Sequence, residues 1–295
     1  MRIDQLLVQR GLASTRSQAQ RLIADGVQWR KMEAGGEVWK RVVKNGDEVP
    51  DDAPIQLLDD SEARYVSRGG LKLEAALKQV GLSVKGLRCL DVGQSTGGFT
   101  DCLLQAGAES VVGVDVGSAQ LHPNLRGDPR VLCVESVNAR TLSAADLIAA
   151  YADSTGADGQ FDEENDEYAN DDGDNAGVDA VPVELPEEFA PPFDLIVADL
   201  AFISQTLVLP AVVPMLGEDG ILLTLVKPQF ELQPGQVGKG GIVRDGAMYA
   251  LVEERVRTAC KDLGLEVTHW FDSPIEGGDG NREFFICARN TAPAV

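Results

Sequence analysis

Apolar positions follow two different patterns along the chain, and the change between them divides it into two parts. In the first 60 residues apolar side chains recur at helical spacing, and Gly11 and Gly26 are placed to end two short helices. Ser14 or Thr15 can cap the second helix. Short strand-like segments follow at residues 27–29, 42–43 and 55–58. This pattern predicts a small α+β domain over residues 1–60.

Beyond residue 64 the chain alternates helical stretches, the first at about 71–80, with wholly apolar runs. These runs and two final strand-like segments lie at residues 88–92, 110–114, 131–134, 193–198, 221–226, 265–271 and 283–289. Strands without polar alternation are typical of a parallel sheet covered on both faces. The sequence therefore predicts an α/β fold, with a doubly wound Rossmann-type sheet over residues 71–295 and a linker at 61–70.

The net charge of −21 conceals an uneven distribution of charged residues. Between Tyr151 and Glu188 there are 14 acidic residues and no Lys or Arg, whereas residues 1–48 carry nine basic and six acidic residues. The acidic stretch, at about residues 152–192, is poor in large apolar side chains, so we expect a disordered or weakly ordered insertion. The basic N-terminal part remains compatible with a nucleic-acid partner.

Length and composition exclude several classes of protein. A chain of 295 residues is long enough for two domains. No apolar run approaches the roughly 20 residues of a membrane span, and the N-terminus lacks the apolar stretch of a signal peptide. Five cysteines without a C-x-x-C pair, and only two histidines, indicate neither a disulfide framework nor a metal site. We expect a cytoplasmic protein that needs no metal.

A glycine-rich turn follows the first apolar run. Its candidate ligand contacts are Asp91, Gly93, Ser95, Thr96, Gly97 and Gly98. Glycines permit a tight turn and a close approach of the backbone to a ligand. A dinucleotide fingerprint would place glycine at position 95, and an acid beside the cofactor suits a sulfonium cation better than a pyrophosphate. The turn therefore favours S-adenosylmethionine over NAD.

Two further acids follow the next two apolar runs. Asp115 lies 22 residues after Gly93, where a carboxylate can accept hydrogen bonds from both ribose hydroxyls of an adenosine. Glu135 follows the run at 131–134, near the expected place of the adenine. We predict both as cofactor contacts; the alternative for each is a solvated loop acid.

Four more charged residues stand at the ends of predicted elements: Lys72, Asp199, Lys227 and Glu283. Open α/β sheets bind ligands at the carboxyl ends of their strands, which is where Asp199 and Lys227 are placed. Each charge alone is more typical of a solvated position. Together they form a candidate catalytic site at one edge of the sheet.

With these motifs the chain resembles the TlyA family of rRNA 2′-O-methyltransferases, also called haemolysin-like proteins. Residues 1–60 resemble an S4-like RNA-binding domain, and the remainder resembles the FtsJ-like methyltransferases. The resemblance implies a Lys-Asp-Lys-Glu catalytic set, matched by Lys72, Asp199, Lys227 and Glu283 in order and context. Two features depart from the family pattern, the acidic insertion and Ala201, where serine is commoner; neither removes a catalytic residue.

The resemblance implies S-adenosylmethionine as cofactor and ribosomal RNA in ribosomal subunits as partner, with cytidine as the target. Lys227 is then the candidate base or hydroxyl-orienting residue, because a ribose 2′-hydroxyl is a poor nucleophile. We expect RNA contacts from the basic side chains of the N-terminal domain: Arg2, Arg10, Arg16, Arg21, Arg30 and Lys31.

Two other classes of function remain as alternatives. The first is an RNA-binding module that carries an inactive methyltransferase domain, against which the complete motifs argue. The second is a membrane-active haemolysin, which the absence of a spanning or strongly amphipathic apolar segment disfavours.

Overall fold

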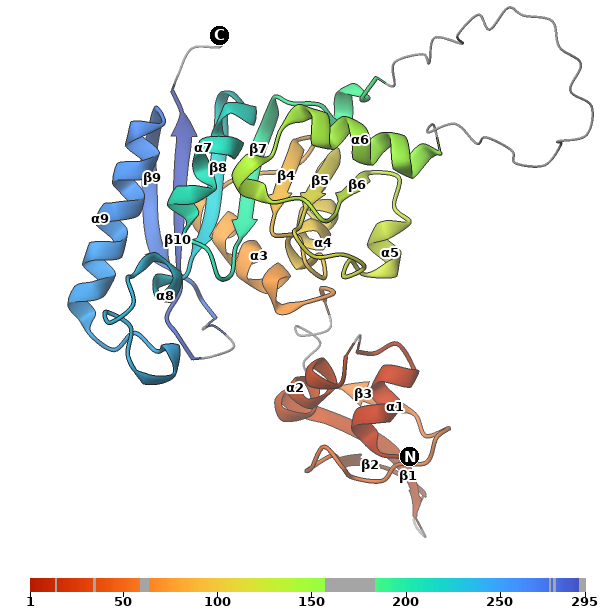
Figure 1. The fold of residues 1–295 in the computed structure, drawn as a ribbon. Helices are drawn as coiled ribbons and strands as arrows, with labels where there is room; N and C mark the ends of the chain where they lie inside the picture. The colour runs from red at the N-terminus through yellow and green to blue at the C-terminus, as the bar shows by residue number, and fades with distance from the viewer. Residues whose placement is uncertain are drawn as a thin grey trace, which may run out of the picture.

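The N-terminal unit combines two helices with a three-stranded antiparallel sheet (Figure 1). The computed structural model describes residues 1–13, 15–33, 36–58, 64–156, 184–275, 277 and 280–291. The elements of this unit are α1 (Ile3–Gln9), α2 (Arg16–Gly26), β1 (Val27–Glu33), β2 (Gly36–Arg41) and β3 (Ile55–Leu57), with strand order β2-β1-β3. Their apolar faces enclose one core around Ile3, Leu7 and Leu22.

Local signals set the limits of these two helices. The Thr15 side chain accepts a hydrogen bond from the Gln18 amide and so caps α2, as one of the two predicted residues. Gly11 follows α1 with φ +69°, a left-handed conformation that glycine adopts without strain. The helices of the N-terminal unit are therefore determined largely by their own sequence.

The predicted strand at residues 42–43 is wrong. The second strand is β2, and it ends at Arg41. Val42 is buried in the N-terminal core and its amide still bonds to the Val27 carbonyl, whereas Val43 is exposed to solvent. Every residue of β2 is exposed, so the strand lacks the burial alternation that would have revealed it.

The larger unit contains a mixed sheet of seven strands with the order β6-β5-β4-β7-β8-β10-β9 (Figure 1). These strands are β4 (Arg88–Val92), β5 (Ser110–Val114), β6 (Val131–Val134), β7 (Phe193–Asp199), β8 (Leu216–Val226), β9 (Leu265–Asp272) and β10 (Phe284–Asn290). The first five are parallel, and β10 runs antiparallel to both of its neighbours. The predicted doubly wound α/β fold is confirmed, with an antiparallel strand added.

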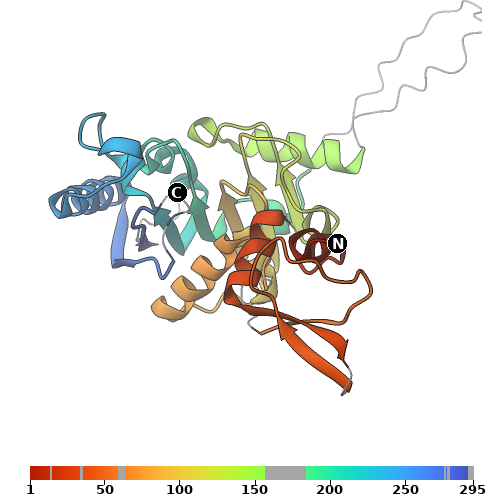
Figure 2. The same cartoon turned by 90° about the horizontal axis from the view of Figure 1, so that it is seen from below.

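Helices cover both faces of this sheet, and α3 and α6 lie on opposite sides of it (Figure 2). The helices are α3 (Arg68–Val80), α4 (Gly98–Gln105), α5 (Pro123–Arg126), α6 (Ala144–Thr155), α7 (Leu209–Val212), α8 (Pro228–Glu231) and α9 (Gly246–Asp262). Short 3₁₀ turns are η2 (Ala139–Thr141), η3 (Glu187–Phe189), η4 (Gln205–Leu207), η5 (Val213–Met215) and η6 (Lys239–Gly241).

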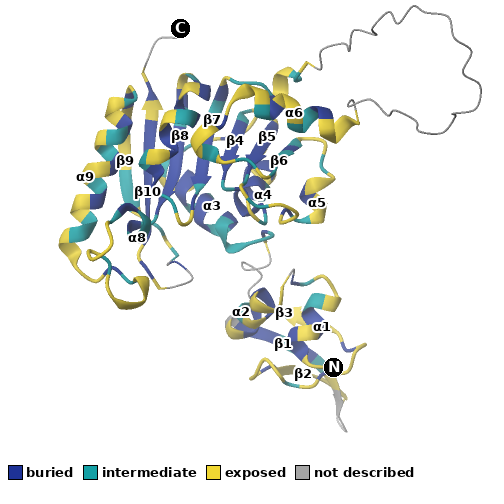
Figure 3. Ribbon diagram, viewed as in Figure 1, coloured by how far each residue is buried: buried dark blue, intermediate teal, exposed yellow. Residues whose placement is uncertain are grey.

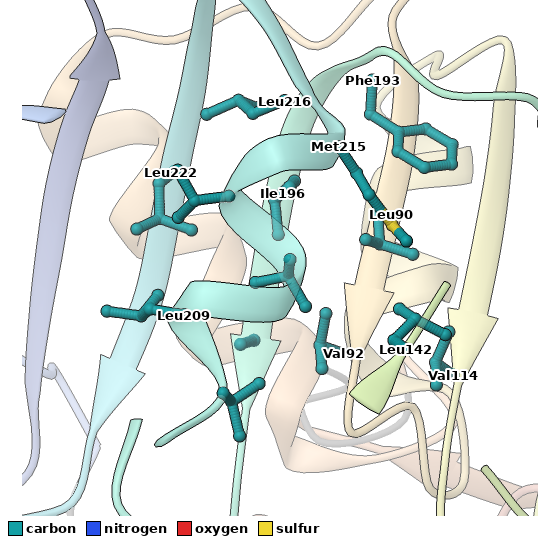
Figure 4. Packing of buried hydrophobic residues seen from close by; sticks show 14 of the residues in the cluster. Leu90, Val92, Val114, Leu142, Phe193, Ile196, Leu209, Met215, Leu216 and Leu222 are labelled. Atoms are coloured by element: carbon teal, nitrogen blue, oxygen red, sulfur yellow. The ribbon is translucent and has the colours of Figure 1, made fainter. Parts of the chain in front are cut away.

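Alternate residues of each central strand enter different cores. Leu90 and Ile196 pack with α6, α7 and α9, in the cluster drawn in Figure 4, whereas Cys89 and Leu195 pack with α3, α4 and α5. The central strands are consequently buried along most of their length, as Figure 3 shows. This two-sided burial explains why their sequences are apolar throughout.

Regular structure occurs at both ends of the stretch that we predicted as an acidic insertion. Helix α6 extends to Thr155, and η3 places Phe189 in the core beneath the sheet, so both ends of the 152–192 stretch are ordered. Residues 157–183 lie outside the described residues. The second half of the predicted linker at 61–70 also belongs to the larger unit, because Tyr65 is buried in its core and α3 begins at Arg68.

Across the described ranges, no helix is both long enough and apolar enough to span a membrane.

Candidate active site

The strand order creates a crevice between the ends of β4 and β7. The chain proceeds from β4 outward to β5 and β6, then returns to β7 on the other side of β4. Such a switch point is where open α/β sheets bind ligands. The chain leaves β4 at Gly93, which has φ +86°. A Cβ atom on this residue would lie 2.7 Å from the Asp199 carbonyl oxygen. Only glycine fits between the two strand ends.

A cavity of about 710 Å³ opens at this switch point. Most of the predicted cofactor residues line it, together with one predicted catalytic pair: Gly93, Ser95, Thr96, Gly98, Asp115, Asp199 and Lys227. The remaining wall is largely apolar and includes Leu200 and Val137. The structure thus brings the glycine-rich turn, the acid after β5 and the ends of β7 and β8 to one cavity.

Asp115 is held by the backbone of the loops around it. Its Oδ2 accepts a hydrogen bond from the Ser95 amide at 2.8 Å, and its Oδ1 accepts one from the Gly117 amide at 2.7 Å. Ser95 reaches this position with φ +49°, a left-handed conformation uncommon for a non-glycine residue. Each carboxylate oxygen has a second lone pair, so Asp115 can still accept two hydroxyl donors from a ligand in the cavity.

Three predicted cofactor residues do not reach the cavity wall. Asp91 is fully buried, accepts a hydrogen bond from the Thr100 hydroxyl at 2.7 Å, and leaves Oδ1 without a partner. Burial raises the pKa of its carboxyl to about 7. Gly97 packs against Leu125, whose Cδ1 would lie 2.4 Å from an added Cβ.

The third is Glu135, which forms an ion pair with Arg126 at 2.6 Å. The hydrogen bond from that guanidinium lowers the pKa of Glu135, although burial opposes the shift. Its carboxylate is therefore engaged by Arg126 of α5, and Glu135 is not one of the residues that line the cavity. The expected contact of Glu135 with an adenine is not supported by this arrangement.

The four charged residues form two buried or half-buried ion pairs. Lys227 Nζ lies 2.5 Å from Asp199 Oδ1, and Lys72 Nζ lies 2.5 Å from Glu283 Oε2. Burial raises the pKa of Glu283, while the charges of Lys72 and Lys227 lower it and Asp199 raises it further. The other three charged residues all act on the Glu283 carboxyl group, so the four residues of the predicted set lie near one another.

A buried carboxylate behind this site was not predicted. Glu231 accepts hydrogen bonds from the Ser204 hydroxyl at 2.5 Å and from the Gln205 amide at 2.7 Å. It thereby ties the loop after β7 to α8, the helix that follows Lys227. Burial raises the pKa of Glu231. The sequence gives little sign of this role, since an acid in a short helix is more often solvated.

The cavity wall also contains side chains that sequence analysis missed, among them Gln94, Asn138 and Phe202. Phe202 is 92% exposed, has φ +63° and lies 5.2 Å from the Phe230 ring centre. All three follow strand ends at the ligand-binding edge, which is the one sequence signal that could have found them. Among the described residues, no group of three or more His, Cys, Asp or Glu could hold a metal ion.

The basic residues of the N-terminal unit differ in their surroundings. Arg10 donates to the backbone carbonyls of Asp51 and Ala53, and Arg30 pairs with Glu37 at 2.8 Å while lying 5.7 Å from the Trp39 ring centre. Arg2 and Arg16 both contact Asp4, Arg21 is half-buried, and Lys31 is exposed.

Comparisons with known proteins agree with this architecture. Residues 65–290 match the FtsJ-like methyltransferase family, and residues 1–26 match the S4 domain. The chain is 38% identical over 288 residues to the 16S/23S rRNA (cytidine-2′-O)-methyltransferase TlyA of Mycobacterium tuberculosis, covering 98% of this chain and 89% of that protein.

Two relatives carry a different name. Hemolysin A of Brachyspira hyodysenteriae is 34% identical over 284 residues, which cover 96% of this chain and 98% of that protein. A solved structure of a hemolysin-named protein from Streptococcus thermophilus superposes with a TM-score of 0.64 at 36% identity, covering 99% of this chain and 88% of that one. The chain therefore belongs to the TlyA group of FtsJ-like methyltransferases that carry an N-terminal S4 domain.

Proposed function

We propose that this methyltransferase transfers the methyl group of S-adenosylmethionine to a ribose 2′-hydroxyl of ribosomal RNA, at cytidine. The observation that carries the proposal is the Lys227–Asp199 ion pair in the wall of the cavity that also contains the glycine-rich turn and Asp115. Lys227, which can orient or deprotonate a hydroxyl group, thus lies beside a site suited to an adenosine. The cytidine target follows from the activity of the mycobacterial relative, a 16S/23S rRNA (cytidine-2′-O)-methyltransferase.

The cavity fits S-adenosylmethionine on chemical grounds. Asp115 offers carboxylate oxygens to two ribose hydroxyls, the backbone at Gly93 permits close approach, and apolar side chains such as Leu200 and Val137 can cover an adenine. When bound, this cofactor supplies an electrophilic methyl group on a sulfonium. In the products that methyl carbon is bonded to the 2′-oxygen, its bond to sulfur is broken, and the hydroxyl proton has left.

Lys227 is the residue we assign to the hydroxyl. As the ammonium of its ion pair with Asp199, the Nζ can orient the 2′-oxygen; as a neutral amine it can accept the hydroxyl proton and so become that ammonium. Lys72 on α3 and Glu283, the residue before β10, form an ion pair and neutralise each other's charge beside Lys227.

The RNA partner is assigned to the N-terminal unit. The S4 match covers residues 1–26, and the basic side chains of residues 1–48 outnumber the acidic ones. Lys and Arg bind phosphates with release of counterions, so this contribution needs no base-specific contact. We propose ribosomal subunits in the cytoplasm as the setting of the reaction.

Mapping 2′-O-methylated nucleotides in rRNA by mass spectrometry tests the proposal. Cells without the protein should lack at least one methylated cytidine, and wild-type chain should restore it whereas Lys227→Ala should not. An identical map with and without the protein would instead support the inactive RNA-binding alternative. No observation on the described residues favours a membrane-active protein.

A further inference from the structure

Asp4 is a fully buried acid in a unit whose proposed partner is RNA. Its carboxylate has no exposed surface, yet it lies in the first turn of α1. Oδ1 and Oδ2 accept hydrogen bonds from Arg2 Nε and Nη2 at 3.1 and 3.0 Å, and Oδ2 also accepts one from Arg16 Nη2 at 3.0 Å. One carboxylate thus joins an arginine before α1 to an arginine at the start of α2.

The two guanidinium groups remain accessible on their other sides. Their side chains are 47% and 56% exposed, respectively. Each guanidinium has five N–H donors, of which Asp4 engages two on Arg2 and one on Arg16. Arg2 also lies over Gly46, where an added Cβ would come within 3.6 Å of its Cζ, so the turn at that glycine leaves room for the guanidinium.

The charge of this group suits a single phosphate. Hydrogen bonds from Arg2 and Arg16 lower the pKa of Asp4 against the effect of its burial, so the carboxylate is ionised at neutral pH. Two guanidinium cations and one carboxylate leave one net positive charge. Planar guanidinium donors match phosphate oxygens, and their position here is fixed rather than flexible.

We propose that Asp4 is a positioning residue that holds Arg2 and Arg16 as a clamp for one phosphodiester group of RNA. The inference rests on the proposed function, because it names the place in the N-terminal unit where a phosphate binds. Arg10 provides the contrast, since its donors are directed at the backbone carbonyls of Asp51 and Ala53.

If Asp4 positions the two arginines, Asp4→Asn should change RNA affinity in the direction opposite to the one that net charge alone predicts. Asp4→Asn removes a negative charge, which by simple electrostatics strengthens RNA binding. If Asp4 positions the clamp, binding to purified rRNA should instead weaken about tenfold, and the slope of log K against log salt should fall by about 1. Asp52→Asn, at an exposed turn residue of the same unit, is the matched control and should leave binding equal or tighter.

Affinities of the full-length chain should be measured over a series of KCl concentrations beside its thermal unfolding. In an Arg2→Gln, Arg16→Gln background Asp4→Asn should cause no further loss, because interacting residues are not additive. If Asp4→Asn unfolds the N-terminal unit, Arg16→Lys takes its place, since lysine keeps the charge but lacks the planar donor fork.

Several results would overturn the clamp. Binding by a folded Asp4→Asn protein that equals or exceeds wild type would do so, as would a full additional loss in the double-Gln background or wild-type affinity in Arg16→Lys. If the wild-type chain shows no salt-dependent binding to rRNA, the proposed function itself fails. These outcomes separate the two ideas.

Discussion

Lys227 Nζ and Asp199 Oδ1 lie 2.5 Å apart and join the ends of two neighbouring parallel strands. Asp199 is the last residue of β7, and Lys227 directly follows β8. Both side chains border the cavity that the Gly93 turn closes from the other side. The two strands β7 and β8 therefore position this ion pair at the cavity in which we propose that a hydroxyl group is methylated.

Replacement of Lys227 should strongly reduce methyl transfer without unfolding the protein. Lys227→Ala should lower single-turnover methylation of rRNA about 10²–10⁴-fold, the usual contribution of a positioned proton-transfer group. Lys227→Arg should not restore it, because guanidinium stays protonated and needs a different geometry. Lys261→Ala, on the exposed face of α9, is the control and should retain full activity. Near wild-type turnover in folded Lys227→Ala protein would rule out the assigned role.

Asp115 should determine cofactor affinity, and Glu135 should not. Loss of a charged acceptor for ribose hydroxyls in Asp115→Ala should weaken S-adenosylmethionine binding at least about tenfold in calorimetry. Glu135→Gln should leave the affinity unchanged, since that carboxylate pairs with Arg126 and does not line the cavity. Equal affinities for wild type and Asp115→Ala would remove Asp115 from the site.

The buried Asp91 carboxyl should make stability depend on pH. Burial raises its pKa to about 7 in the folded protein, above the unfolded value. Its favourable contribution is therefore complete at acidic pH and is lost as pH rises through about 7. Asp91→Asn cannot ionise, so its stability relative to wild type should rise between pH 5.5 and 8. Over this pH range the gain should be roughly 2 kcal/mol, because about 1.5 pH units separate pH 5.5 from the folded pKa and each unit is worth about 1.4 kcal/mol.

Urea unfolding at both pH values measures this difference. Asp262→Asn, an exposed carboxyl near the end of α9, is the control and should track wild type. Identical pH dependence of Asp91→Asn and wild type would show that the Asp91 carboxyl titrates normally.

Gly93→Ala should damage the site through contact rather than through backbone strain alone. The new methyl group would lie 2.7 Å from the Asp199 carbonyl oxygen and would force β4 and β7 apart at the crevice. Gly81→Ala is the matched control, since Gly81 also has positive φ (+67°) but an added Cβ meets nothing within 4 Å. Both variants should lose about 1–2 kcal/mol of stability to the left-handed conformation. Cofactor binding should fall only in Gly93→Ala; retention of binding there would contradict the crevice assignment.

Removal of residues 1–60 should uncouple catalysis from RNA binding. The truncated chain keeps Tyr65 and α3, which pack in the larger unit, and should retain the circular dichroism of an α/β fold. Its methylation of ribosomal subunits should be lost, and that of the full chain should decline steeply with salt as counterion release requires. Full activity of the truncated protein would refute this division of roles.

The sequence by itself determined the secondary elements that have a strong period and the residues that stand at strand ends. Asp115, Asp199 and Lys227 were predictable because parallel strands place their carboxyl ends at one edge whatever their order. The apolar runs also predicted two-sided burial correctly. Exposed β2 gave no such signal and was missed.

Only the tertiary structure decided which charges meet. Strand order put Gly93 beside Asp199, and it left Asp91 beneath the turn and Glu135 beside Arg126. Lys72 and Glu283 are 211 residues apart in sequence, and Asp4 gains its burial from the packing of α1 and α2. Hydrophobic periodicity indicates which residues of a helix or strand face the core. The partner of a charged residue instead depends on contacts between elements that are distant in the chain.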